Sequence, residues 1–496
     1  MNRLSAKNIF RLFGIAVIAL SLPIAIYLVD NETNFFKRAS GEPANLEVGG
    51  ETDPTSRVTN QWNNIAQGGS DETRMLEPIV GDLQHLSPEY IRIDHLYDRY
   101  NVVSRDGGGN IVLEWSNLDL TVNDILNTGA KPFFSLSYMP HVMASSGDVT
   151  DTPSSWSEWE YLVKETVEHY SGSNGLNIPM VYYEVWNEPD LFGNFKAGKG
   201  KNYFDLYLHA IRGAQSAKNT QVFKIGGPGT TSLYSSWFNK FISFVADNNL
   251  WLDYYSWHNY SQDLSDYERD LENISSWIKD FPGYSGIELV LSETGYSSEL
   301  DGAHDGNKSA IHTLAMATVL DGKVDKTFSF QAKDNKGDTK YWGNWGLLTH
   351  EAYGEPIKKP RYLALEFLNR MVGDPIVVNG EGSWVKAFAR KDGEVLRLLV
   401  VNYDPNDKHS ESVPLSFGNL DESKYVFRRI DFRGVVHERS IDVVGGVWST
   451  REYFESNSAA IFELSPEVLV FERDVLGLYD DILRQLADNK EVVALF

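Results

Sequence analysis

The sequence predicts an α/β fold, a closed (β/α)8 barrel (TIM barrel) followed by a small all-β domain. The chain has 496 residues, more than one ordinary domain needs and enough for a barrel with an appended domain. From about residue 56, short apolar runs alternate eight times with helical patterns, which is typical of βα units on a parallel sheet. After Gly373 the helical pattern stops and only short strand patterns follow. We therefore expect a barrel over 55–372 and an antiparallel β-sandwich over 373–467.

The N-terminus carries an uncharged apolar segment. Residues 12–29 contain no charged side chain and are just long enough to cross a bilayer as a helix. Basic residues precede this run and acidic residues follow it, so the positive-inside rule places the rest of the chain outside the cytoplasm. The sequence predicts a membrane anchor over 1–30, with the protein facing the periplasm or the cell exterior. The alternative is a cleaved signal sequence and a secreted protein.

The segment 31–54 is rich in Gly, Glu, Asn and Thr, and this composition predicts a flexible linker. The barrel strands that follow are short runs, mostly apolar and often β-branched or aromatic. Their expected ranges are 57–63, 90–94, 132–138, 180–186, 222–226, 252–258, 287–292 and 327–331.

Apolar residues at helical spacing lie between these runs. The helix expected after Ser116, for example, has an apolar stripe and a glycine, Gly129, placed to end it. The last barrel helix begins at Pro360, a residue favoured in the first helical turn. In the C-terminal domain the expected strands are 383–389, 395–402, 425–432 and 459–464. The tail 468–496 has apolar residues clustered on one side and predicts helix.

Two glutamates stand where buried strands end. Glu188 lies near the end of the run Val181–Asp190 (Val-Tyr-Tyr-Glu-Val-Trp-Asn-Glu-Pro-Asp), and Glu293 closes the apolar run that begins at Ile287. The carboxyl ends of barrel strands face one mouth of the barrel, so the two side chains are expected there. A poorly solvated carboxylate holds its proton more tightly than a free one, as a general acid requires. Two such carboxyl groups are the catalytic residues that glycoside hydrolases use to cleave glycosidic bonds.

The motifs around these glutamates resemble clan A of the retaining glycoside hydrolases, and family 39 within it. The resemblance is carried by Trp186-Asn187-Glu188-Pro189 and Ser292-Glu293-Thr294-Gly295. It extends to Tyr90-Ile91-Arg92, Lys131–Phe134 with Tyr138-Met139-Pro140, Ser256–Tyr260 and Gly346-Leu347-Leu348. This likeness implies a (β/α)8 barrel in which Glu188 is the acid/base and Glu293 the nucleophile. It also implies that Asn187 contacts the sugar 2-hydroxyl.

The sequence departs from the family pattern near the same residues. Asp94 stands where β-xylosidases and α-L-iduronidases of the family usually carry His, and Ser292 and Thr294 flank the nucleophile in place of Asn and Trp. These changes weaken any transfer of xylosidase or iduronidase specificity. Relatives that cut bacterial exopolysaccharides internally share the Arg-x-Asp pattern, so the resemblance favours an exopolysaccharide substrate.

Further side chains at or beyond the strand ends are candidate substrate contacts. Arg92 can hold Glu293 ionised, since an opposite charge lowers a carboxylate pKa. Polar candidates for hydrogen bonds to the sugar or the nucleophile are Asp94, Tyr138, His258 and Tyr260. Aromatic candidates for stacking on a sugar face are Trp257, Tyr296, Trp342 and Trp345.

Composition excludes several other functions. The net charge of −24 argues against nucleic acid as a partner, because binding phosphates needs clustered Lys and Arg. With 0 Cys there is neither a disulfide framework nor thiolate chemistry. The 11 His show no metal-binding spacing. A match to a phosphate-binding loop at 193–199 lacks the Ser or Thr that must follow, since Gly200 stands there. Neither a metal nor an organic cofactor is expected.

The predicted function is hydrolysis of O-glycosidic bonds in an oligosaccharide or polysaccharide by double displacement. Three alternatives remain open at this stage. The barrel can be a catalytically silent polysaccharide-binding scaffold of the cell envelope, an exo-acting enzyme similar to β-xylosidases, or a transglycosylase that uses the same residues with another acceptor.

Overall fold

The computed structural model describes residues 41–52, 61–68 and 74–467. The expected anchor or signal sequence (1–30) and the expected helical tail (468–496) lie outside these residues. No helix in the described part of the chain has the length and apolarity needed to cross a membrane.

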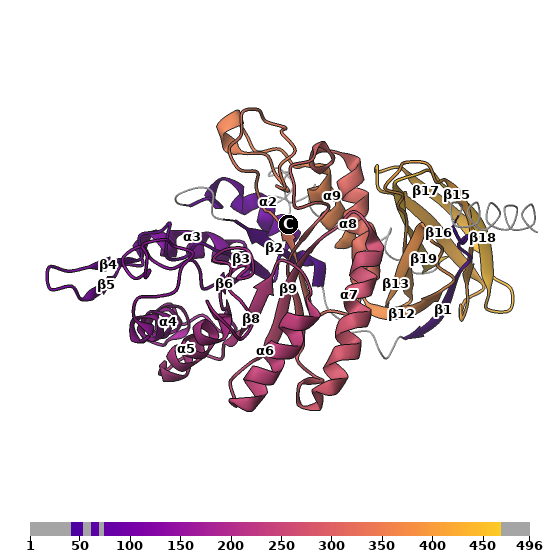
Figure 1. The fold of residues 1–496 in the computed structure, drawn as a ribbon. Coiled ribbons are helices and arrows are strands. Elements are labelled where there is room, and N and C mark those ends of the chain that lie inside the picture. Colours follow the sequence, from indigo (N-terminus) through magenta and orange to yellow (C-terminus); the bar gives the residue numbers. More distant parts are fainter. Residues whose placement is uncertain (1–40, 53–60, 69–73, 468–496) are drawn as a thin grey trace, which may run out of the picture.

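Eight parallel strands close into a barrel, as the sequence predicts (Figure 1). The strands are β2 (Asn64–Gln67), β3 (Tyr90–Ile93), β6 (Lys131–Ser135), β7 (Tyr182–Glu184), β8 (Lys224–Thr230), β9 (Tyr254–Tyr260), β10 (Glu288–Gly295) and β11 (Lys326–Phe330). The first strand begins later than expected, after the short helical turn Gln61–Asn63. The barrel closes where β11 pairs with β2.

Helices surround the barrel. They are α2 (Val80–Leu86), α3 (Ser116–Asn127), α4 (Trp156–Ser171), α5 (Tyr203–Ser216), α6 (Ser235–Asp247), α7 (Leu264–Trp277), α8 (Asn307–Leu320) and α9 (Pro360–Leu368). A hairpin of β4 (Val103–Arg105) and β5 (Ile111–Leu113) is inserted between β3 and α3 and projects from the body (Figure 1). The sequence analysis did not anticipate this hairpin.

The barrel interior is filled in layers. Large side chains from several strands, among them Tyr90, Phe133, Tyr182 and Tyr254, form a buried cluster. Side chains alternate between the two faces of a strand, so the residues two positions further along also point inward. That next layer contains Arg92 on β3 and Glu184 on β7, both almost fully buried. The charged layer therefore lies directly above an aromatic one.

The C-terminal domain is one nine-stranded sheet in the order β17-β16-β19-β14-β13-β12-β1-β15-β18. Its strands are β1 (Leu46–Thr52), β12 (Asp374–Asn379), β13 (Val385–Asp392), β14 (Val395–Asn402), β15 (Glu411–Phe417), β16 (Lys424–Asp431), β17 (Val436–Asp442), β18 (Trp448–Phe454) and β19 (Ser458–Pro466). Phe427 of β16 contacts Trp448 of β18 with ring centroids 4.7 Å apart. The two ends of the sheet thus face each other around a shared core, as in a sandwich.

Strand β1 corrects the expected flexible linker over 31–54. Residues 46–52 of that segment pair antiparallel with β12 and parallel with β15. Leu46 and Val48 are buried in the core of the C-terminal domain. Residues 46–52 thus belong to the sheet of the C-terminal domain although they precede the barrel in the sequence, and one pair of this sheet is parallel.

The C-terminal domain packs against the α7 and α8 side of the barrel (Figure 1). Tyr403 donates a hydrogen bond to the carbonyl of Gln262 at 2.8 Å, and Lys386 pairs with Glu268 of α7 at 2.8 Å. The buried Arg390 pairs with Asp321 at the end of α8. These contacts fix the sheet to the outside of the barrel.

Candidate active site

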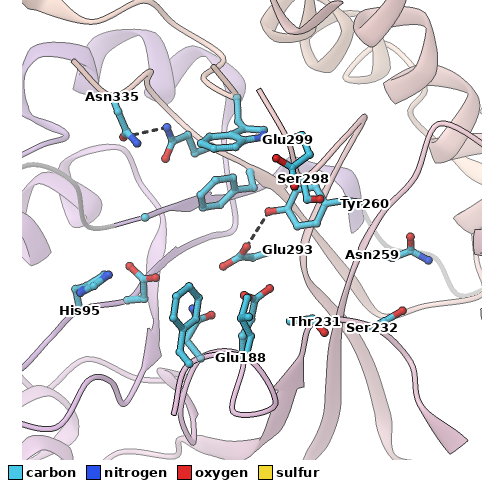
Figure 2. A pocket seen from close by; sticks show the side chains of 18 of the residues that line it. His95, Glu188, Thr231, Ser232, Asn259, Tyr260, Glu293, Ser298, Glu299 and Asn335 are labelled. Carbon is cyan, nitrogen blue, oxygen red and sulfur yellow. Dashed lines mark hydrogen bonds between the residues drawn. The ribbon is translucent and has the colours of Figure 1, made fainter. Parts of the chain in front are cut away.

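A cleft of about 800 Å³ opens at the carboxyl ends of the barrel strands, the end that carries active sites in this fold. Glu188 and Glu293 both line it. Figure 2 shows the two carboxylates in the middle, with His95 on one flank and Thr231, Ser232 and Asn259 on the other. The cleft therefore extends to both sides of the carboxylate pair.

Arg92 is the centre of a buried network below this cleft. Its side chain is 1% exposed. It donates to Glu184 Oε2 at 2.6 and 2.9 Å, to Glu293 Oε1 at 2.7 Å and to Asn187 Oδ1 at 2.7 Å. Two carboxylates thus share one guanidinium, whose planar fork suits such bonds. Glu184 was not among the predicted site residues, although its contact with Arg92 makes it part of the network.

Glu293 reaches this network through an irregularity in β10. Between Leu291 and Glu293 this strand advances two residues while β9 advances one, from Trp257 to His258. Such a bulge re-aims a side chain, and here both Ser292 and Glu293 are buried. The second oxygen, Oε2, accepts a hydrogen bond from Tyr260 at 2.7 Å.

The surroundings of Glu293 favour its ionised form. Burial alone would raise the pKa of this carboxyl. The positive charges of His258 and Arg92, with the hydrogen bonds from Tyr260 and Arg92, outweigh burial and hold the pKa of Glu293 below its ordinary value. Glu293 is therefore a carboxylate at neutral pH.

Glu188 has a pKa shifted in the opposite direction. It follows β7 with a left-handed backbone (φ 45°), a conformation that costs about 1–3 kcal/mol and is concentrated at functional sites. Burial raises the pKa of Glu188 above its ordinary value, against the lowering effect of His258, whose Nδ1 lies 2.9 Å from Oε1. The nearby charge of Glu293 adds to the upward shift. The pKa values of the two carboxyl groups are thus shifted in opposite directions.

His258 lies between the two carboxylates. One oxygen of Glu188, one of Glu293 and a ring nitrogen of His258 are within 4.8 Å of one another. Burial lowers the pKa of His258, but the carboxylates of Glu293 and Glu188 raise it by more, so the net shift is upward. Among the described residues, this is the one group of three such side chains close enough to hold a metal ion. Arg92 and Tyr260 already donate hydrogen bonds to the two oxygens of Glu293. These donors stabilise Glu293 as an anion and occupy the oxygens that a metal ion would need.

Three of the predicted hydrogen-bonding residues gather on one flank. Asn187 donates to Tyr138 Oη at 2.8 Å while its carbonyl accepts from Arg92. Tyr138, Asn187 and Asp94 all line the cleft. Burial raises the pKa of Tyr138, so its hydroxyl stays protonated. This flank offers donors and acceptors to a sugar bound against Glu293.

The predicted aromatic platforms divide into one that lines the cleft and three that do not. Trp345 lines it, with Nε1 donating to the carbonyl of Ser297 at 3.0 Å. Trp257 is 0% exposed and points away, and its Nε1 donates to Asp270 at 3.1 Å. Tyr296 is buried against His312, with ring centroids 5.4 Å apart. Trp342 packs over Gly337, where an added Cβ would lie 2.5 Å from the ring. Trp257, Tyr296 and Trp342 therefore pack within the protein and do not contribute to the cleft surface.

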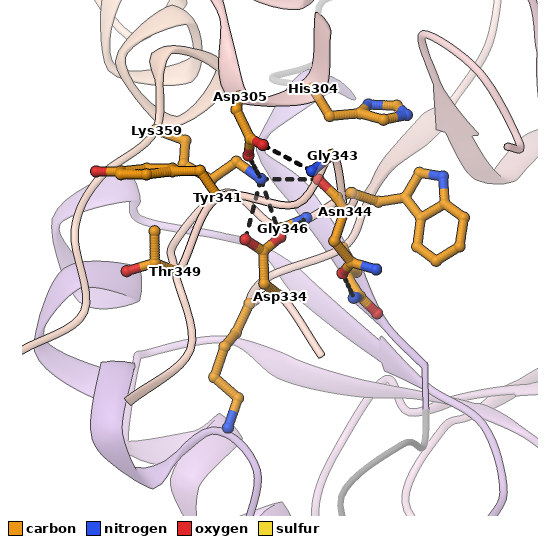
Figure 3. A network of polar contacts seen from close by, with 12 residues as sticks. His304, Asp305, Asp334, Tyr341, Gly343, Asn344, Gly346, Thr349 and Lys359 are labelled. Carbon is orange, nitrogen blue, oxygen red and sulfur yellow. Dashed lines mark hydrogen bonds and ion pairs between the residues drawn. The ribbon is translucent and has the colours of Figure 1, made fainter. Parts of the chain in front are cut away.

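A second buried network holds the loop that carries Trp345 (Figure 3). Lys359, at the start of α9, is 0% exposed and pairs with Asp305 at 2.6 Å and Asp334 at 2.9 Å. It also donates to the carbonyl of Asn344 at 2.7 Å. Asp334 in turn accepts from the backbone of Gly346, where an added Cβ would lie 2.1 Å from the nitrogen of Asp334. The loop after β11 is thereby fixed on both sides of Trp345.

Comparison with known proteins agrees with this geometry. The model of glycosyl hydrolases family 39 matches residues 63–274. A β-xylosidase from Caldicellulosiruptor saccharolyticus is 33% identical over 376 residues, covering 69% of this chain and 73% of the relative. A β-xylosidase from Geobacillus stearothermophilus is 24% identical over 332 residues, covering 60% and 64%.

Solved structures show the same fold. A family 39 enzyme from Xanthomonas axonopodis pv. citri matches with a TM-score of 0.70 at 20% identity, covering 86% of this chain and 98% of that one. A monomeric β-xylosidase from Caulobacter crescentus CB15 has a TM-score of 0.70 at 19% identity, covering 86% and 100%. The resemblance found in the sequence motifs is confirmed: this chain belongs to glycosyl hydrolases family 39 and is a glycosidase.

Proposed function

We propose that the enzyme is a retaining glycosidase in which Glu293 is the nucleophile and Glu188 the acid/base. The observation that supports this most is the separation of the two side chains, whose facing oxygens lie within 4.8 Å. Retaining enzymes place their carboxyl groups about 5–5.5 Å apart, whereas inverting enzymes need about 6.5–9.5 Å to admit a water molecule. The opposed pKa shifts of Glu188 and Glu293 agree with the two roles.

The reaction then has two steps. In the first, a carboxylate oxygen of Glu293 forms a bond to the anomeric carbon while the bond to the leaving oxygen breaks. Glu188 gives its proton to that oxygen. In the second, water attacks the same carbon, Glu188 takes the proton from the water, and the ester to Glu293 breaks. Esterification removes the negative charge of Glu293, so the pKa of Glu188 falls and it becomes a base.

We propose an oligosaccharide or polysaccharide substrate, with an exopolysaccharide as the preferred class. The cleft extends to both sides of the carboxylates, as cleavage within a chain requires (Figure 2). Asp94, where family β-xylosidases usually carry His, lines the cleft next to His95. A second candidate is exo action on β-xylosides, favoured by the names of the two β-xylosidase relatives.

The test is a panel of aryl glycosides and purified exopolysaccharides, assayed for phenol release and for new reducing ends. The wild type should hydrolyse at least one of them, and Glu293→Gln should lose the activity. Glu355→Gln, an exposed glutamate outside the cleft, is the matched control and should retain it. Binding of a polysaccharide without any release would instead indicate a silent scaffold, and an active Glu293→Gln protein would exclude the proposed nucleophile.

We also propose that the enzyme acts outside the cytoplasm, anchored by residues 12–29, because this run is uncharged and long enough to span a bilayer. Cell fractionation tests this. The full chain should sediment with membranes and a chain that starts at residue 31 should not, whereas equal solubility of both would exclude the anchor.

A further inference from the structure

The flank of the cleft that faces away from Tyr138 has no assigned role. It is formed by the loop after β8, the end of β9 and the first half of α7, and its lining includes Thr231, Ser232, Asn259 and Asp270. Figure 2 shows Thr231, Ser232 and Asn259 together on this flank of Glu188. These side chains have the hydroxyl, amide and carboxylate groups that bind sugar hydroxyls.

Asp270 is the most unusual member of this flank. It is 8% exposed, yet it lines the cleft. Its Oδ2 accepts both internal hydrogen bonds, from Asn259 Nδ2 at 2.7 Å and from Trp257 Nε1 at 3.1 Å. Oδ1 receives neither of them. Burial raises the pKa of Asp270 to about 6, although both hydrogen bonds oppose the shift. Burial disfavours the charged form of Asp270, and its Oδ1 accepts neither of the internal hydrogen bonds. This oxygen can therefore accept a hydrogen bond from a ligand.

The position of this flank indicates which part of the substrate it contacts. Asn187, Tyr138 and Arg92 are bonded to one another and, through Arg92, to Glu293. The sugar that is attacked must lie against Glu293 and this group. The leaving oxygen must lie against Glu188, and the remainder of the leaving group then continues along the opposite flank.

We propose that Asp270, Asn259 and Ser232 form a subsite for the leaving sugar unit, with Asp270 accepting a hydroxyl hydrogen bond. This inference rests on the proposed function. Hydrogen bonds to an ionised acceptor are stronger than neutral ones. Trp257 is a positioning residue, because its indole nitrogen donates a hydrogen bond to Oδ2 of Asp270.

The substitution Asp270→Asn separates this role from a structural one. The amide oxygen of asparagine can still accept from Trp257 and Asn259, which keeps the internal network. The amide nitrogen then replaces the outward oxygen, so that a donor faces the substrate where an acceptor stood. The variant should therefore fold as the wild type does, which a thermal unfolding scan checks.

The assay compares two substrates with the same reacting sugar, an aryl glycoside and a disaccharide, chosen from those the wild type cleaves. We expect Asp270→Asn to reduce the ratio of kcat/KM for the disaccharide to that for the aryl glycoside about 10- to 100-fold, the effect of one hydrogen bond to a charged group. Glu272→Gln, an exposed position on α7 outside the cleft, is the control and should leave the ratio unchanged.

The outcomes separate the two proposals. An unchanged ratio in Asp270→Asn, with an active enzyme, would overturn the subsite and leave the hydrolytic function intact. An equal loss on both substrates would also overturn it, because the effect would then not depend on the leaving sugar. A wild type that cleaves no glycoside or polysaccharide of the panel would overturn both proposals.

Discussion

Replacing Arg92 by methionine tests the charged layer of the barrel. The guanidinium is 1% exposed and makes four hydrogen bonds, two to Glu184 and one each to Glu293 and Asn187. Methionine fills most of the same space, so the main loss is electrostatic. Two buried carboxylates are then left without their shared cation. Removing one partner of a buried pair costs about 3–5 kcal/mol, and we expect the free energy of unfolding at pH 7 to fall by about that amount.

The pH dependence of this loss has a definite sign. The pKa of Glu293 is lowered in the folded protein, so its stabilising contribution is present above the unfolded pKa of about 4.3 and is lost as the pH falls through the folded value. Without Arg92 that contribution largely disappears. The stability gap between wild type and Arg92→Met should therefore be widest near neutral pH and narrow below about pH 4.

Urea unfolding followed by tryptophan fluorescence, at several pH values between 7 and 3, measures this gap. Arg212→Met is the control. Arg212 is 54% exposed and lies as far as 3.8 Å from its partner Glu160, so the loss of this ion pair should cost little stability. Equal stability of Arg92→Met and wild type at pH 7 would refute the reasoning, and so would a gap that does not change with pH.

Three further predictions concern single contacts. Glu188→Gln should reduce kcat/KM about 100- to 10,000-fold on substrates with poor leaving groups, and much less on dinitrophenyl glycosides, which need no protonation; equal losses on both would argue against an acid role. Tyr260→Phe removes a donor 2.7 Å from Glu293, so the acidic limb of the kcat/KM profile should move to higher pH; an unshifted limb would contradict this. Lys359→Met should lower the free energy of unfolding in urea by about 3–5 kcal/mol, because Asp334 is left buried and unpaired. Lys358→Met, at a partly exposed neighbour, should not, and similar losses in both would count against the network.

The barrel and the carboxylate pair could be predicted because both are local in the sequence. Each strand is a short apolar run. Glu188 comes shortly after β7, and Glu293 lies near the end of β10. Glu184 was missed, although a signal for it existed. Tyr182 fills the barrel interior, and the period of two in a strand places Glu184 on the same face. The buried Arg92 on β3, which is separated from β7 by β6, needs such a partner.

The same period could have excluded Trp257 from the cleft. His258 points inward, so the side chain of Trp257 must point toward α7, where its indole nitrogen meets Asp270. Strand β1 could not have been found in this way. Its sequence contains Gly49 and Gly50, which weaken the strand pattern, and it forms only by pairing with β12 and β15, far along the chain. The bulge in β10 that brings Glu293 inward also depends on the register with β9.

The stereochemistry of hydrolysis tests the double displacement most directly. Proton NMR of the first product released from the aryl glycoside that is cleaved fastest identifies its anomeric form before mutarotation. Glu188 and Glu293, with oxygens within 4.8 Å, predict that the product has the configuration of the substrate. A product of inverted configuration would show that water attacks the substrate directly, and would contradict the role given to Glu293.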